Sequence, residues 1–246
     1  MTSRYQYFKG EKDKEFVIAS MEKYVDEKQE MDKYLEKLIS PFLKKDPLKI
    51  LDACCGIGHI CYFLSKMNPN NKFVGIDQTE YLIDEAKKLC KNKNNIKFET
   101  IDFFDFSKNH KKEFDICINW KTLSWIPYYE DFVKELMKVT KKQIFLSSLF
   151  YDGDIDFQVK VREFQKENGE NDFNSYYNVY SLPRFKKFLM DMGAKKINVY
   201  DFNLEKDIKK PPVDQMGTYT EKLSTGKRLQ ISGIVVMNWK IIQIDL

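Results

Sequence analysis

The chain has 246 residues, of which 43% are hydrophobic, and its 41 basic and 37 acidic side chains leave a net charge of +4. One domain of this length buries about 70 to 75% of its unfolded surface, and the five cysteines form no C-x-x-C pair, so neither a disulfide framework nor a metal is expected. No basic face, membrane-length segment or apolar leader over residues 1–13 is evident, so we expect no nucleic-acid partner, no membrane and a cytoplasmic location.

The N-terminal part is predicted to be helical. Apolar residues recur at three- and four-residue steps from Phe16 to Phe42, which predicts one long or two short amphipathic helices over residues 13–44. Pro41 and Pro47 then mark the entry to the first strand. We expect residues 1–47 to form a helical lid.

The first strand, expected over residues 48–54, runs into a turn with two glycines. Asp52 is followed by Gly56 and Gly58, and a helix is expected directly afterwards over residues 59–67. A sharp strand-to-helix turn needs glycine where the backbone bends or approaches a ligand, and the helix start offers unpaired N–H groups. A dinucleotide site would need a third glycine, and the acid before the turn would repel a pyrophosphate. The pattern predicts another kind of nucleotide pocket.

The order acid, two residues, Cys-Gly-x-Gly in this turn resembles motif I of the class I S-adenosylmethionine-dependent methyltransferases. The resemblance implies a Rossmann-like fold, S-adenosylmethionine as the cofactor, and an acid and loop that face the cationic amino-acid end of the cofactor. Asp52, Cys54, Gly56 and Gly58 are therefore expected to bind it. The alternative is an ordinary strand-turn-helix with two convenient glycines.

Acids also follow the next two strands, expected over residues 72–77 and 96–101. An acid at the tip of the second strand of a β-α-β unit accepts ribose hydroxyls, so we predict Asp77 as the ribose ligand with Gln78 beside it. The resemblance implies that Asp102 meets the adenine amino group and that Phe103 packs against the ring. A loop-capping role is the alternative for Asp102, because aspartate favours turns.

The fourth strand, expected over residues 114–119, leads into Asn119 and Trp120. In this family the strand end faces the methyl group and the acceptor, so both residues are added to the expected cofactor site. Residues 119–122 read Asn-Trp-Lys-Thr, which is neither the Asn/Asp-Pro-Pro-Tyr/Phe of base-amine methyltransferases nor the Pro-Cys of C5 pyrimidine methyltransferases. Because both motifs are missing, a nucleic-acid base is a less favoured methyl acceptor. Packing at the core edge is the alternative role for Trp120.

The remaining pattern continues to alternate between strand and helix. Helices are expected over 79–91, 128–139 and 181–192, and strands over 143–149, 195–203 and 230–244. Such alternation requires right-handed crossovers and a mostly parallel sheet covered on both faces. The predicted fold is α/β, a Rossmann-like seven-stranded sheet whose last strand is antiparallel. We expect one methyltransferase domain over 1–246, with a cofactor-binding core over 48–149, an acceptor cap inserted over 150–180 and a closing part over 181–246.

The insert after the fifth strand lies where open α/β sheets bind ligands, and a passive surface hairpin is the alternative. After it, residues 175–185 read Ser-Tyr-Tyr-Asn-Val-Tyr-Ser-Leu-Pro-Arg-Phe. The step Tyr180-Ser181-Leu182, which opens the helix after the fifth strand, resembles small-amine N-methyltransferases of the phosphoethanolamine and sarcosine type. The resemblance implies acceptor contacts, and it implies that a tyrosine before the first helix closes the site. The expected acceptor residues are Tyr5, Tyr176, Tyr177, Tyr180 and Arg184, and the expected lid and catalytic hydroxyl is Tyr7.

The resulting hypothesis is a small-molecule N-methyltransferase whose acceptor is phosphoethanolamine or a related precursor of a bacterial capsule or surface glycan. Neither histidine is a strong base candidate, since His110 lies in a lysine-rich loop and His59 follows the glycine turn. The alternatives are an O-methyltransferase, an enzyme that acts on RNA or protein, an NAD enzyme, and a non-catalytic binding module.

Overall fold

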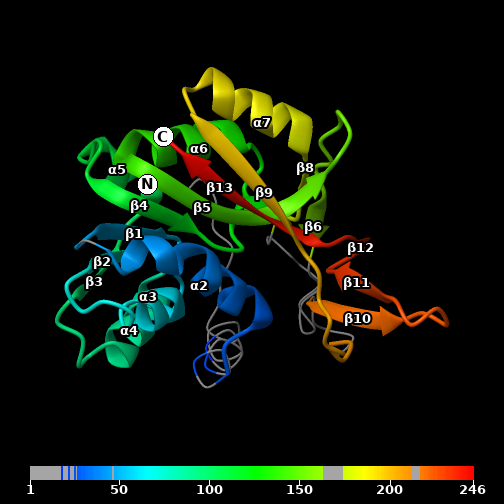
Figure 1. Cartoon of the computed structure of the whole chain (residues 1–246), viewed down its shortest axis with the longest axis horizontal. Helices are drawn as coiled ribbons and strands as arrows, with labels where there is room; N and C mark the ends of the chain where they lie inside the picture. Colours follow the sequence, from blue (N-terminus) through cyan, green and yellow to red (C-terminus); the bar gives the residue numbers. More distant parts are fainter. Residues whose placement is uncertain are drawn as a thin grey trace.

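The computed structural model describes residues 27–45, 47–162, 174–211 and 217–246, together with residues 18, 22 and 25 (Figure 1). The helices are α2 (Glu30–Leu43), α3 (His59–Leu64), α4 (Glu80–Leu89), α5 (Phe103–Lys108), the 3-10 turn η1 (Leu123–Trp125), α6 (Tyr129–Val139) and α7 (Leu182–Asp191). The strands are β1 (Lys49–Ala53), β2 (Lys72–Asp77), β3 (Ile96–Thr100), β4 (Phe114–Asn119), β5 (Thr140–Tyr151), β6 (Lys160–Arg162), β7 (Asn174–Tyr176), β8 (Val179–Ser181), β9 (Lys196–Phe202), β10 (Thr218–Lys222), β11 (Arg228–Ser232), β12 (Val235–Val236) and β13 (Trp239–Asp245).

The main sheet has the strand order β3-β2-β1-β4-β5-β13-β9. Strands β1 to β5 pair in parallel, whereas β13 runs antiparallel to both of its neighbours, β5 and β9. Strand β8 adds in parallel to the last three residues of β5, beyond the part that β4 covers. The predicted seven-stranded, mostly parallel sheet with an antiparallel last strand is therefore confirmed.

Side chains alternate between the two faces of the sheet and build a core on each. On β4, Cys117 packs in the cluster that includes α6 and α7, while Ile116 and Ile118 pack in the cluster that includes α2 and α3. Figure 1 shows the same division, with α5, α6 and α7 on one side of the sheet and α2, α3 and α4 on the other. On both faces apolar side chains are removed from contact with water, and this burial is the main contribution to the stability of such a sheet.

Two predicted strands need correction, and some elements were not predicted. The strand expected over 230–244 is interrupted, because Gly233 takes a left-handed conformation (φ 63°) between β11 and β12. Strands β10, β11 and β12 form a separate three-stranded sheet, drawn in orange and red beside the main one in Figure 1. Helix α5 was not predicted, and β5 is longer than the expected 143–149.

The expected lid and cap are described in part. Helix α2 confirms the C-terminal half of the helices predicted over 13–44, and most residues before 27 lie outside the described part. Within the insert over 150–180, β6 and β7 pair in antiparallel orientation. No helix in the described ranges is long and apolar enough to cross a membrane.

Candidate active site

The turn after β1 has three left-handed residues within five positions. The φ angles are 63° at Cys54, 54° at Gly56 and 74° at Gly58. A β-carbon at Gly58 would also lie 2.5 Å from the Phe98 ring, so glycine is required there by the backbone and by packing. The sequence suggested that this turn needs glycine, and at Gly58 the structure shows two causes, the left-handed backbone and the neighbouring Phe98 ring.

Asp77 ends β2 and holds this turn. One carboxylate oxygen accepts the Gly56 N–H at 3.0 Å and the other accepts the Thr79 N–H at 2.9 Å. Burial raises the pKa of Asp77, and the N–H bonds from Thr79 and Gly56 lower it in part. Because each carboxylate oxygen can accept a second hydrogen bond, both could still receive a ribose hydroxyl. Half-buried Gln78 follows directly.

A second carboxylate, Asp52, is 1% exposed in β1. Burial and, to a smaller extent, the carboxylates of Asp77 and Asp32 raise its pKa to about 7. Beside β1, Asn119 donates to the Ala53 carbonyl at 3.0 Å, while its own buried Oδ1 accepts no hydrogen bond from any described residue. A buried carboxyl group whose pKa is near 7 and the Asn119 Oδ1 acceptor fit a cationic ligand that carries N–H donors.

At the end of β3, Asp102 is the N-cap of α5, and its Oδ1 accepts the Phe104 N–H at 2.8 Å. The capping role that the sequence left open is therefore present, and an adenine contact would be additional to it. Phe103 is 5% exposed and packs on Phe132 with ring centroids 4.7 Å apart. Helix α5 turns Phe103 into the core, so its predicted place against the adenine ring is not supported.

Beyond β4 lies a network that the sequence did not reveal. Asp32, 3% exposed on α2, accepts the Trp120 indole N–H at 2.8 Å and the Lys121 ammonium at 2.9 Å. Its second oxygen lies 3.5 Å from His59 Nε2. Burial alone would raise the pKa of Asp32, but Lys121 and His59 hold it well below its usual range. Lys121 also donates to the Gln29 side chain.

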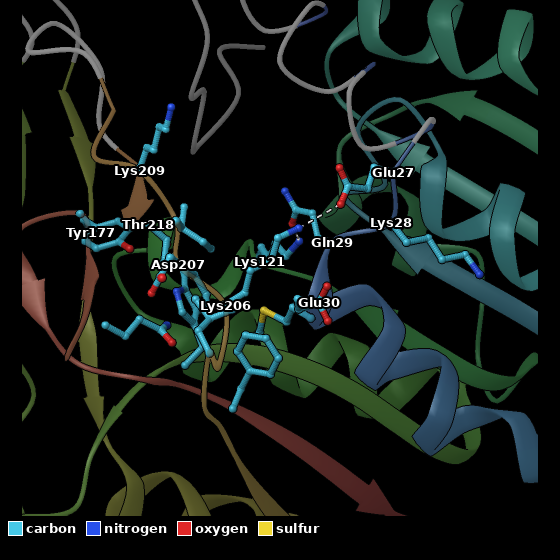
Figure 2. A pocket seen from close by; sticks show the side chains of 18 of the residues that line it. Glu27, Lys28, Gln29, Glu30, Lys121, Tyr177, Lys206, Asp207, Lys209 and Thr218 are labelled. Carbon is cyan, nitrogen blue, oxygen red and sulfur yellow. Dashed lines mark hydrogen bonds and ion pairs between the residues drawn. The ribbon is translucent and has the colours of Figure 1, made fainter. Parts of the chain in front are cut away.

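A pocket of about 650 Å³ opens beside Lys121, and we call it the α2–β10 pocket (Figure 2). Its lining comes from the start of α2, the segment after β4, Tyr177, the segment after β9, and the small sheet. Four aromatic side chains line it: Trp125, Tyr177, Phe202 and Trp239. The charged side chains along it are Glu27, Lys28, Glu30, Lys121, Lys206, Asp207 and Lys209. Figure 2 shows Lys121 near the centre, reaching toward Gln29.

Of the predicted acceptor residues, Tyr177 alone among those described lines this pocket, with its ring against Trp125 at 4.9 Å between centroids. Tyr180 is 2% exposed, and its hydroxyl lies beside the carbonyl oxygens of Leu123, at 3.0 Å, and Ile126. It therefore holds the segment after β4 from within the core and does not reach the pocket.

Arg184 is exposed and forms an ion pair with Asp154 at 2.6 Å, away from the pocket lining. Tyr176 is half-buried in β7 and likewise does not contribute to the lining. Tyr5 and Tyr7, the expected lid residues, lie outside the described residues. The structure therefore brings most of the predicted cofactor residues together, with Phe103 turned into the core, and disperses most of the predicted acceptor residues.

Asp32 and the lining from the segment after β9 were missed from the sequence. One signal for Asp32 was available, because an acid at position 32 interrupts the buried stripe formed by Leu35, Ile39 and Leu43 on α2. The part of the pocket contributed by β10 and β11 had no comparable signal, since it depends on how the small sheet folds beside the main one.

Three comparisons with known proteins agree with this geometry. A family model described as "Methyltransferase domain" matches residues 44–206, which is more than half of the chain. Among curated proteins, the chain is similar to the release factor glutamine methyltransferase of Buchnera aphidicola subsp. Acyrthosiphon pisum (strain APS), with 34% identity over 107 residues. That alignment covers 44% of this chain and 35% of the relative, so the match spans about a third of the relative's length.

Solved structures share the fold at low sequence identity. The N-terminal domain of EvdMO1, solved with SAH and D-fucose, has a TM-score of 0.59 and 13% identity, with 89% of this chain and 83% of that chain covered. The DhpI-SAH complex has a TM-score of 0.57 and 12% identity, with coverage of 94% and 93%. Magnesium protoporphyrin IX methyltransferase (ChlM) from Synechocystis PCC 6803 with bound SAM has a TM-score of 0.51 and 14% identity, with coverage of 86% and 78%. At this identity the likeness establishes the fold, and the ligands of those proteins, SAM and SAH, agree with the cofactor predicted for this chain.

Proposed function

Because this chain belongs to the family of methyltransferase domains, we propose that it transfers a methyl group from S-adenosylmethionine to an amine of a small molecule bound in the α2–β10 pocket. The observation that carries the proposal is the position of this pocket. It is lined by Lys121 and Trp125, directly after the end of β4, where the methyl group and acceptor meet in enzymes of this kind. Its volume of about 650 Å³ lies within the range of small-molecule sites.

The strand ends supply the groups that the cofactor would need. Asp77 would bind the ribose hydroxyls, and Asp102 would meet the adenine amine. Asp52 and the unfilled Oδ1 of Asn119 would face the cationic amino-acid end. When bound, the cofactor supplies a methyl group already activated by a sulfonium, so the protein mainly has to orient the acceptor and exclude water.

The Lys121 ammonium supports an amine as the nucleophile. An amine must be neutral to attack, and the nearby Lys121 ammonium disfavours a second positive charge and so lowers the pKa of an amine placed beside it. The four aromatic rings offer a surface for an apolar body. His110 is not a candidate base, because it stacks on Phe106 at 4.0 Å and pairs with Glu113 near the opposite end of the sheet.

The pocket also bears on the size of the acceptor. Phosphoethanolamine, the acceptor suggested by the sequence resemblance, is much smaller than the drug-sized ligands that such a volume holds. Its phosphate could meet Lys206 or Lys209, but it has no apolar part for the aromatic rings. We therefore propose an amine with a larger, partly apolar body, and keep phosphoethanolamine as the smallest compound to test.

O-methylation is the second candidate, and Lys121 is the observation that favours it. A cation beside an acidic hydroxyl or carboxyl group stabilises the deprotonated oxygen, which is the nucleophile in that reaction. An RNA acceptor, or a protein acceptor such as the name of the release factor glutamine methyltransferase indicates for that relative, would need to place its target group in the same pocket.

The test begins with mass spectrometry of the purified protein for retained S-adenosylmethionine. A methyl-release assay then compares apolar amines, phosphoethanolamine, phenols, carboxylic acids, RNA and protein. Leu204→Trp fills the pocket and should abolish transfer, while the matched change Leu223→Trp, on an exposed residue outside the lining, should not. Transfer to phenols or acids alone would establish the second candidate. Transfer only to RNA or protein would reject a small-molecule acceptor.

A further inference from the structure

One buried carboxylate touches both segments that border the proposed reaction site. Asp32 contacts Trp120 and Lys121, which follow β4, and lies 3.5 Å from His59, which begins α3 directly after the glycine turn. Its own helix begins with Glu30 and Met31, which line the α2–β10 pocket. Asp32 therefore connects the predicted cofactor turn, the segment after β4 and one wall of the pocket.

A carboxylate is not needed to attach α2 to the sheet. Leu35, Ile39 and Leu43 are fully buried on the same stripe of the helix and supply that attachment. A carboxylate removed from water is costly unless its oxygens are hydrogen-bonded and a cation lies beside it. At Asp32, Oδ1 accepts both hydrogen bonds, from Trp120 and Lys121, and Oδ2 lies 3.5 Å from His59 Nε2. A hydrophobic residue would serve packing at lower cost.

The backbone at Lys121 supports a role in positioning. Lys121 has a left-handed conformation, with φ at 61°, which is unfavourable for a residue with a side chain. The contacts that hold it there include its N–H, which donates to Ser147 Oγ at 2.9 Å, and its ammonium, which donates to Asp32. Such strained residues persist only where the surroundings hold them, and they are concentrated at functional sites.

We propose that Asp32 is a positioning residue for methyl transfer, which orients Trp120 and Lys121 where the cofactor site meets the acceptor pocket. This inference rests on the proposed function and adds a residue from the N-terminal helix to it. Asp32 acts through its neighbours, so its loss should impair ligand binding and transfer by more than any general loss of stability explains.

The test compares Asp32→Asn with Asp115→Asn. Asp115 is a suitable control because it too accepts an N–H, here the Lys49 backbone N–H at 3.0 Å, and pairs with a lysine, Lys142 at 3.1 Å, but lies at the opposite end of β4. Calorimetry with S-adenosylmethionine and S-adenosylhomocysteine, thermal unfolding and the NMR resonance of the Trp120 indole N–H are measured for each. We expect Asp32→Asn to shift the indole resonance and to weaken cofactor binding roughly ten-fold. Asp115→Asn should leave both unchanged within about two-fold.

A second variant keeps the inference testable if Asp32→Asn does not fold. Trp120→Phe retains the ring and removes only the indole donor, so it should reproduce part of the loss in cofactor affinity. In a folded double variant the two losses should not add, because both remove the same contact. With any acceptor found in the panel, kcat should fall in Asp32→Asn and stay unchanged in Asp115→Asn.

Other outcomes would overturn the inference. If the wild-type protein binds the cofactor and Asp32→Asn binds it equally well, or if Asp115→Asn loses as much affinity, Asp32 is a structural ion-pair residue only. If Asp32→Asn does not fold and Trp120→Phe binds the cofactor as tightly as the wild type, the positioning role is likewise excluded. If the wild-type protein binds neither adenosyl compound, the proposed function fails, and this inference fails with it.

Discussion

Asp77 and Asp102 stand at neighbouring strand ends, but their carboxylates hold different parts of the chain. Asp77 secures the glycine turn through Gly56, whereas Asp102 caps α5. Asp77→Ala should weaken S-adenosylmethionine binding by about 1.5 to 3 kcal/mol, since two ribose hydroxyls lose their acceptor, and Asp102→Ala by about 1 kcal/mol. Isothermal titration of both variants checks this order.

Asp102→Ala should in addition lower the stability of the free protein by about 0.5 to 2 kcal/mol, because the first turn of α5 loses its cap. Asp102→Asn serves as the control, since asparagine can cap the helix. Equal losses of cofactor affinity in the two alanine variants would mean that the ribose and adenine roles are assigned wrongly.

The raised pKa of Asp52 predicts a pH dependence with a definite sign. The folded-state pKa, about 7, lies above the unfolded value, so the contribution of Asp52 to stability is present at low pH and is lost as the pH rises through 7. A cationic ligand favours ionised Asp52, so S-adenosylmethionine should bind roughly ten-fold more tightly at pH 7.5 than at pH 5.5 and release a proton.

Calorimetry in buffers of different ionisation enthalpy measures that proton. Asp52→Asn should remove most of the pH dependence, and what remains would come from the amino group of the ligand itself. A wild-type affinity that does not change with pH would show that Asp52 is not in contact with the cationic end of the cofactor.

At the scale of elements, β8 holds the segment between β4 and α6. The Tyr180 hydroxyl lies beside the carbonyl oxygens of Leu123 and Ile126, and Asn178 donates to the Ile126 carbonyl at 2.9 Å. Tyr180→Phe should therefore lower the free energy of unfolding by about 1 to 3 kcal/mol, because buried carbonyl groups lose a donor.

Urea denaturation of Tyr180→Phe measures this loss. The matched control is Tyr200→Phe, whose hydroxyl donates to the Gln243 side chain at 3.1 Å in the half-buried part of the sheet and should cost less. A change in the acceptor KM of Tyr180→Phe without any loss of stability would instead support the acceptor contact first predicted for Tyr180.

Glycine can be required by a left-handed backbone or by a close neighbouring side chain. Three glycines of this chain distinguish the two reasons. Gly193 is left-handed with nothing within 4 Å of a β-carbon, Gly75 has ordinary φ but meets the Phe98 ring at 2.5 Å, and Gly58 combines both features. Alanine should cost about 1 to 2 kcal/mol at Gly193 and about 1 to 3 kcal/mol at Gly75. Gly58→Ala should cost the most.

Thermal unfolding of the three alanine variants tests this order in the wild type and in Phe98→Leu. The smaller side chain at position 98 should reduce the cost at Gly58 and Gly75 and leave the cost at Gly193 unchanged. If it reduces none of them, the Phe98 ring moves aside freely, and packing is not the reason for glycine at these positions.

At the scale of the whole molecule, the two ligands should protect different parts of the chain from hydrogen exchange. S-adenosylmethionine should protect residues 54–58 and 77–79. An accepted amine should protect residues 204–209, most of which line the pocket, and β10, which begins at the pocket with Thr218. At a ligand concentration of about 100 Kd, exchange through openings that break the site slows about 100-fold.

Mass spectrometry of the exchanged peptides follows both ligands in one experiment. Helix α7 is the internal control, because neither site includes it. Protection of β10 and β11 by the cofactor alone would show that the α2–β10 pocket is part of the cofactor site and not a separate acceptor site.

The sequence alone determined the parts of this protein that depend on local chemistry and chain order. Alternating strands and helices predicted the parallel sheet, and acids at successive strand ends predicted the cofactor residues, because the carboxyl ends of parallel strands meet at one edge. Only the tertiary structure decided the rest. Phe103 and Tyr180 are residue types that often contact ligands, but α5 and β8 turn them into the core. Asp32 joins Lys121, 89 positions away, because α2 packs across the end of β4. The lining of the pocket likewise depends on distant segments that meet only after folding, and no local pattern in the chain specifies that meeting.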